Sequence, residues 1–129
     1  MGKWAAIFKL VEVLAFSLRG DVPAETLLKR TQGALAQNIE AMRIAEHRGE
    51  PAKQRELASS NEALIMDALA ALIIRAEQQL AARELTACEH TIAALEQALA
   101  KLSAYFELSE QFAKLEALKA ALARAKLPL

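Results

Sequence analysis

The stretch RELTACEHTI, residues 83–92, contains the side chains best suited to chemistry in this chain. Cys88 is the only cysteine, and His90 is one of two histidines. A catalytic thiol needs a neighbouring base and an accessible, electropositive setting. Helical spacing instead places Cys88 on an apolar stripe with Ile92 and Leu95, whereas His90 falls on a polar face. The pattern predicts that Cys88 is a small core residue and that His90 is a surface residue.

A metal site on this helix would need a second ligand three or four residues after His90. Those positions hold Ala93 and Ala94. The sequence also has no CxxC pair, no glycine-rich phosphate loop and no EF-hand loop. We therefore expect no metal, no cofactor and no catalytic residue.

Arg83 and His90 stand in an R-x6-H spacing, which resembles the motif of HEPN-type helical ribonucleases, where both residues face one RNA-binding cleft. In a continuous helix the two side chains would share a face, roughly 10 Å apart along the axis. The position after the arginine, typically a polar residue in that motif, is Glu84 here. The resemblance implies a ribonuclease that uses Arg83 and His90, as an alternative function.

The only concentration of basic residues surrounds Gly49. Acidic residues dilute it, and no aromatic side chain is interleaved to stack on bases. A zero formal net charge also differs from the basic excess of most nucleic-acid binders. A second alternative is a subunit of a nucleoprotein complex that contacts the RNA or DNA backbone through residues 43–55. The candidate phosphate contacts are Arg43, Arg48, Lys53 and Arg55.

The composition predicts an all-α protein. Hydrophobic residues make up 54% of the 129 residues, and only four glycines and three prolines are available for tight turns. We expect one domain spanning residues 1–129, an antiparallel bundle of four main helices, possibly five. The expected helices cover about residues 3–19, 23–48, 51 or 60–84, and 86–127.

Turn and capping residues divide these helices. Gly20 suits the end of the first helix, and Asp21 can cap the second. The sequence from Gly49 to Pro51 is the clearest turn. Gly33 interrupts the second helix, and a close approach by another helix would explain it.

Two capping boxes pair a hydroxyl residue with a glutamate three positions later. Ser59 and Glu62 form the first, so the third helix could begin at Pro51 or near residue 60. Thr86 and Glu89 form the second, which predicts that the last helix begins there.

The last third of the chain carries two apolar seams of the coiled-coil kind. The first contains Cys88, Ile92, Leu95, Leu99, Leu102 and Phe106, and the second contains Tyr105, Leu108, Phe112 and Leu115. The seams are one residue out of phase, so a straight helix cannot keep both against one partner. We expect a kink or a break near residues 103–109.

The N-terminal segment WAAIFKLVEVLAFSL is apolar, but Lys9 and Glu12 interrupt it. It is shorter than the ~20 residues that span a membrane. We expect no membrane partner and a cytoplasmic location. Most of its apolar residues share one face, whereas Phe16 lies among the charges on the other side.

The N-terminal helix has more apolar surface than one neighbouring helix would cover. This surplus favours a non-catalytic protein-interaction module. It would act as a homo-oligomer or as a small scaffold, adaptor or chaperone-like subunit of a larger assembly. Aromatic side chains commonly anchor interfaces, and a half-buried amide such as Asn38 can fix register or partner. The candidate interface residues are Trp4, Phe8, Phe16, Tyr105, Phe106 and Phe112.

Overall fold

The computed structural model describes residues 2–128, which form five α-helices and no strand. This confirms the all-α bundle predicted from composition. The helices are α1 (Gly2–Ser17), α2 (Val22–His47), α3 (Pro51–Ala81), α4 (Leu85–Leu102) and α5 (Ser109–Ala125). The expected break near residues 103–109 separates α4 from α5, and residues 51–60, which the sequence left open, belong to α3.

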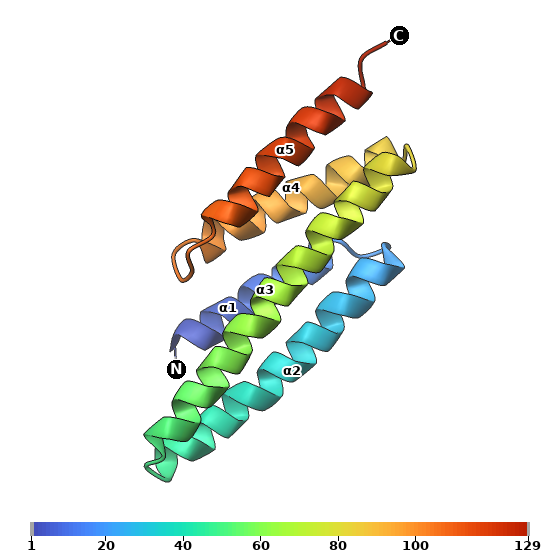
Figure 1. The fold of residues 1–129 in the computed structure, drawn as a ribbon. Coiled ribbons are helices and arrows are strands. Elements are labelled where there is room, and N and C mark those ends of the chain that lie inside the picture. Colours follow the sequence, from blue (N-terminus) through green and yellow to red (C-terminus); the bar gives the residue numbers. More distant parts are fainter. Residues whose placement is uncertain (1, 129) are drawn as a thin grey trace.

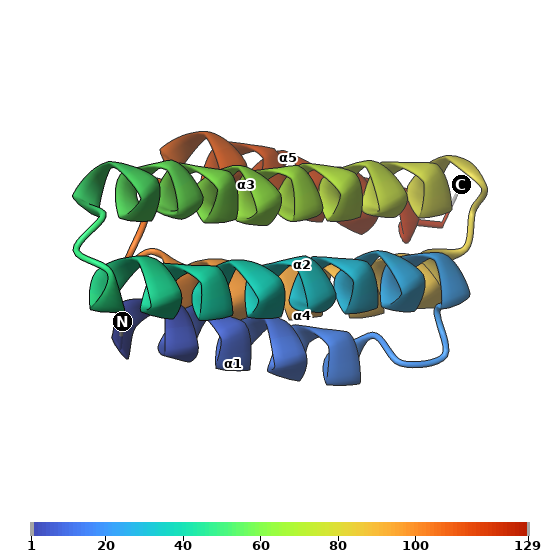
Figure 2. The same cartoon turned by 90° about the horizontal axis from the view of Figure 1, so that it is seen from below.

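Successive helices run in opposite directions (Figure 1). The first four form a ring in which α1 packs on α2, α2 on α3, α3 on α4, and α4 back on α1. The fifth helix packs against α3 and α4, outside this ring. The view turned by 90° places α3 and α5 in one layer and α1 on the opposite side of the molecule (Figure 2). One broad side of α1 is therefore left uncovered by the other four helices.

The core lies around α3, which packs against α2, α4 and α5. Its fully buried residues include Ile65, Leu69 and Leu72. Of the described helices, α3 alone is long and apolar enough to cross a membrane, although a core helix meets the same criteria. The other helices contribute a matching apolar stripe to this core: Ile7, Leu28, Leu35, Leu95, Leu99 and Leu115.

The predicted turns form at two glycines. Gly20 has φ +94° and Gly49 has φ +67°, a left-handed conformation that glycine adopts without steric cost. The Ala24 backbone N–H donates to Asp21 Oδ1 at 3.4 Å, so Asp21 caps α2 as expected. These short turns fix α1, α2 and α3 as antiparallel neighbours.

Neither capping box caps a helix. Ser59 lies inside α3, and Thr86 lies inside α4, which begins one residue earlier without a side-chain cap. A hydroxyl can cap only where backbone N–H groups lack a carbonyl partner. Inside a continuous helix those N–H groups already bond four residues back, so the motif has nothing to satisfy.

The close approach expected at Gly33 is also absent. The residue is exposed, and a Cβ built on it would meet no heavy atom within 4 Å. We have no packing reason for glycine at this position.

The connection between α4 and α5 is anchored by aromatic packing. The rings of Trp4 and Phe106 lie 6.1 Å apart, and the Lys3 ammonium sits 5.2 Å from the first centroid and 5.5 Å from the second. Leu108 is buried in the same connection. The chain reverses here, so the second seam packs α5 on α3 and α4.

Candidate functional site

The six aromatic interface candidates fall into three environments. Trp4 is only 6% exposed, and its contact with Phe106 lies within the chain. Phe8, Tyr105, Phe106 and Phe112 are partly buried against the core. Phe16 is 67% exposed. Of the six, Phe16 alone is largely exposed to solvent.

The outer face of α1 carries two exposed large apolar side chains, Val13 and Phe16. Val13, 50% exposed, lies one helical turn before Phe16. The Arg19 guanidinium lies 4.1 Å from the Phe16 ring centroid, a cation–π contact. Lys9 and Glu12 form an exposed ion pair at 3.6 Å on the same side of the helix. This face therefore combines an aromatic projection with charges of both signs.

An apolar hollow of about 310 Å³ lies beside this face, between α1 and α2. Phe8 and Ile39 are partly buried in the core below it. Small side chains leave the space open, because an alanine ends at Cβ. The residues that line the hollow are Ala5, Phe8, Lys9, Ala36, Ile39 and Glu40.

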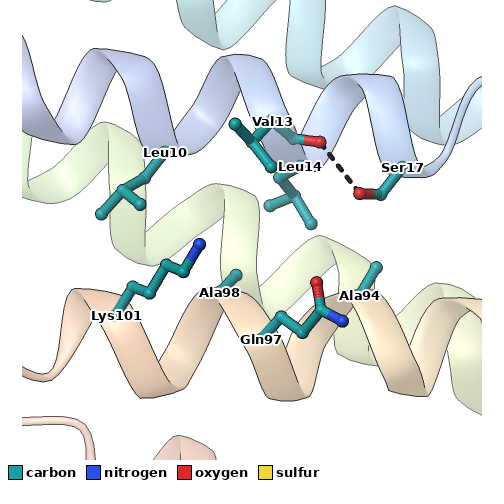
Figure 3. A pocket seen from close by; sticks show the side chains of 8 residues that line it. All are labelled: Leu10, Val13, Leu14, Ser17, Ala94, Gln97, Ala98 and Lys101. Atoms are coloured by element: carbon teal, nitrogen blue, oxygen red, sulfur yellow. Dashed lines mark hydrogen bonds between the residues drawn. The ribbon is translucent and has the colours of Figure 1, made fainter.

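The other flank of α1, against α4, is closed. Figure 3 shows Leu10, Val13, Leu14 and Ser17 facing Ala94, Gln97, Ala98 and Lys101 across this seam. The Ser17 hydroxyl donates to the Val13 carbonyl at 3.0 Å, within α1 (Figure 3). The remaining space is about 10 Å³, roughly enough for one water molecule. This seam holds the bundle together and has no room for a ligand.

A polar cleft of about 300 Å³ lies where the α1–α2 turn meets α3 and α4. Arg75 Nε and Gln79 Nε2 each donate to Asp21 Oδ2 at 3.1 Å. The Thr91 hydroxyl donates to Gln79 Oε1 at 2.7 Å. Among the described residues, no buried side-chain nitrogen or oxygen lacks a hydrogen-bond partner. The buried polar atoms of the cleft wall are therefore satisfied by the chain itself.

A second buried polar contact joins α2 to α3. Asn38 Nδ2 donates to Asn61 Oδ1 at 2.9 Å and to Ser60 Oγ at 3.2 Å. Asn61, 0% exposed, also donates from Nδ2 toward Met42 Sδ at 3.5 Å. The half-buried Asn38 thus contacts a neighbouring helix of its own chain, which is the geometry of a register-fixing amide.

The structure does not bring Arg83 and His90 together on one helix. Arg83 has φ 62° in the connection between α3 and α4, where the helix is interrupted. Its Nη2 donates to the Ala125 carbonyl at 3.5 Å, toward the end of α5. His90 is exposed at the rim of the polar cleft. The continuous helix that the R-x6-H pairing requires is absent.

Cys88 is fully buried, as the apolar seam predicted. Its thiol lies 3.4 Å from the Ala76 carbonyl. Burial raises the pKa of the Cys88 thiol, and Lys126 offsets this only in part. The neutral thiol is favoured, which is the opposite of an activated nucleophile.

The basic candidates surround the α2–α3 turn, and all four are exposed. Arg43 pairs with Glu40 at 2.6 Å, and Lys53 pairs with Glu56 at 3.8 Å. Local carboxylates therefore pair with two of the four candidate cations, Arg43 and Lys53. The other two candidates are Arg48 and Arg55.

Sequence reasoning missed three buried polar residues: Asn61, Gln79 and Thr91. Two of them had a detectable signal. Gln79 continues the heptad stripe of Ile65 and Leu72, and Thr91 lies inside the α4 seam. A polar residue at a core position needs a partner, and the pattern itself does not reveal which one.

Within residues 2–128, no cluster of three His, Cys, Asp or Glu side chains could hold a metal ion. Comparisons of the chain with protein-family models, curated proteins and solved structures found no match. Function must therefore be argued from the chain's own surface.

Proposed function

We propose that the chain is a non-catalytic protein-interaction module that binds its partner through the outer face of α1. The observation that carries this proposal is the exposure of Phe16, 67%, and Val13, 50%, on adjacent turns of one helix. Burying a fully exposed side chain of this size is worth roughly 1.5–3 kcal/mol, and each of these two residues gains the part that corresponds to its remaining exposure.

The neighbouring hollow supports this assignment. Phe16 projects from α1, and the hollow between this helix and α2 is lined by residues that include Ala5, Phe8 and Ile39. Aromatic anchors that fill apolar pockets, surrounded by polar residues, are typical of interface centres. Ile74, which is also exposed, does not line this hollow.

A site-specific cross-link tests this function. A photo-crosslinking amino acid would replace Val13 in one variant and Ile74, 53% exposed on α3, in a matched control. After illumination in extracts of the cells that make the protein, we expect a defined adduct from position 13 and none from position 74. Position 13 is expected to lose that adduct when Phe16 is also changed to Asp.

The mass of the adduct identifies the kind of partner. Twice the mass of the chain indicates a second copy, and any other mass indicates a different protein. If position 13 yields no adduct beyond that of the control, the proposed function is refuted.

A further inference from the structure

We propose that the partner on this surface is a second copy of the chain, with the two α1 helices antiparallel across a two-fold axis. This inference rests on the proposed function and names its partner. In such an isologous interface, every contact from one copy to the other occurs twice.

The spacing of residues along α1 gives this pairing its register. At 100° per residue, Ala5, Lys9, Glu12 and Phe16 fall within one sector of about 60° on the outer face. The pair Ala5–Phe16 and the pair Lys9–Glu12 share the same midpoint, between Leu10 and Val11. A two-fold axis through that midpoint therefore aligns both pairs at once.

In this register each Phe16 lies over Ala5 of the other copy. Ala5 and Phe16 of one copy are roughly 16 Å apart along α1. Antiparallel pairing therefore places Phe16 of one copy over the hollow beside Ala5 of the other, once at each end of the interface. The hollow of about 310 Å³ extends beneath that position to Phe8 and Ile39. One helix thus supplies both the side chain that protrudes and part of the space that receives it.

The charges match in the same register. Lys9 of each copy lies opposite Glu12 of the other, which gives two intermolecular ion pairs close to the axis. The two-fold operation also keeps both α2 helices on the same side of the interface. Arg19, stacked on Phe16, then lies near Glu40, which lines the hollow of the other copy. Parallel pairing would instead place Lys9 against Lys9, so charge favours the antiparallel arrangement.

Sedimentation velocity over a range of protein concentrations tests the dimer. We expect reversible dimerisation of the unaltered chain. Phe16→Ala should weaken it at least tenfold, because it removes the aromatic anchor twice per dimer. Ile74→Ala serves as the matched control and should leave the dissociation constant unchanged.

Two charge reversals test the register. Lys9→Glu sets carboxylates against carboxylates across the axis, and Glu12→Lys sets ammonium groups against ammonium groups. Each variant alone should therefore dimerise several-fold more weakly. When the two variants are mixed, both intermolecular pairs become attractive, and a heterodimer should form. Circular dichroism of each variant verifies that the bundle remains folded.

Three results would overturn this inference. They are a chain that remains monomeric at all concentrations, dimerisation that survives Phe16→Ala, and a charge-reversed mixture no stronger than its components. A Val13 adduct of foreign mass together with a monomeric chain would refute the dimer and retain the interaction function. Failure of both experiments would refute both proposals.

Discussion

The two buried polar contacts of the bundle differ in what they connect. Asn38 and Asn61 join α2 to α3, which a short turn already makes neighbours. The cluster of Asp21, Gln79 and Thr91 joins the α1–α2 turn to α3 and α4, which are distant in sequence. We therefore expect the first contact to help select the register between two helices and the second to help close the ring.

Their electrostatics differ as well. The amide pair is neutral, and Asn38 is only partly buried. The cluster contains the Arg75–Asp21 ion pair, whose side chains are 28% and 16% exposed. Removing one partner of a largely buried ion pair leaves an uncompensated charge, whereas a half-buried amide can turn to solvent. The ring-closing cluster should therefore tolerate less change.

The largest effect is expected for Asp21→Ala. This change removes the α2 cap and leaves both Arg75 and Gln79 without their shared acceptor. We expect the free energy of unfolding to fall by about 3 kcal/mol, measured by urea denaturation. Glu77→Ala, at an exposed position of α3, is the control and should change stability by less than about 0.5 kcal/mol. Equal losses in the two variants would show that the cluster contributes nothing.

A smaller effect is expected for Asn61→Ala in the register contact. The change opens a small cavity and removes the bond from Asn38, but Asn38 can then bond to Ser60 and to water. We expect a loss of about 1.5 kcal/mol by the same measurement. A loss as large as that of Asp21→Ala would remove the distinction between the two contacts.

The sequence predicted the features that depend on local pattern. The turns at Gly20 and Gly49 follow from glycine conformation, and the break after Leu102 follows from the phase shift between two seams. The burial of Cys88 follows from its position on the first seam. Each of these depends on residues close together along the chain.

Other features were less predictable, two because of the local backbone and one because it needs a neighbouring helix. Ser59 and Thr86 matched a capping pattern, but continuous backbone bonding made it irrelevant. The pairing of Arg83 with His90 required a continuous helix. The helix is interrupted at Arg83, which adopts φ 62°. The hollow beside Phe8 needs Ala36 and Ile39 of α2, so α1 alone could not reveal it.

The smallest losses of stability are expected when one hydroxyl is removed from each polar contact. Ser60 is exposed, so water can replace its oxygen as an acceptor for Asn38 after Ser60→Ala. Thr91 is buried, and Thr91→Val removes the hydroxyl that donates to Gln79 Oε1. We expect losses below about 0.5 kcal/mol for Ser60→Ala and of about 1 kcal/mol for Thr91→Val, both from urea denaturation. Equal losses would mean that water reaches Gln79 through the polar cleft, and ring closure would then depend mainly on the bonds to Asp21.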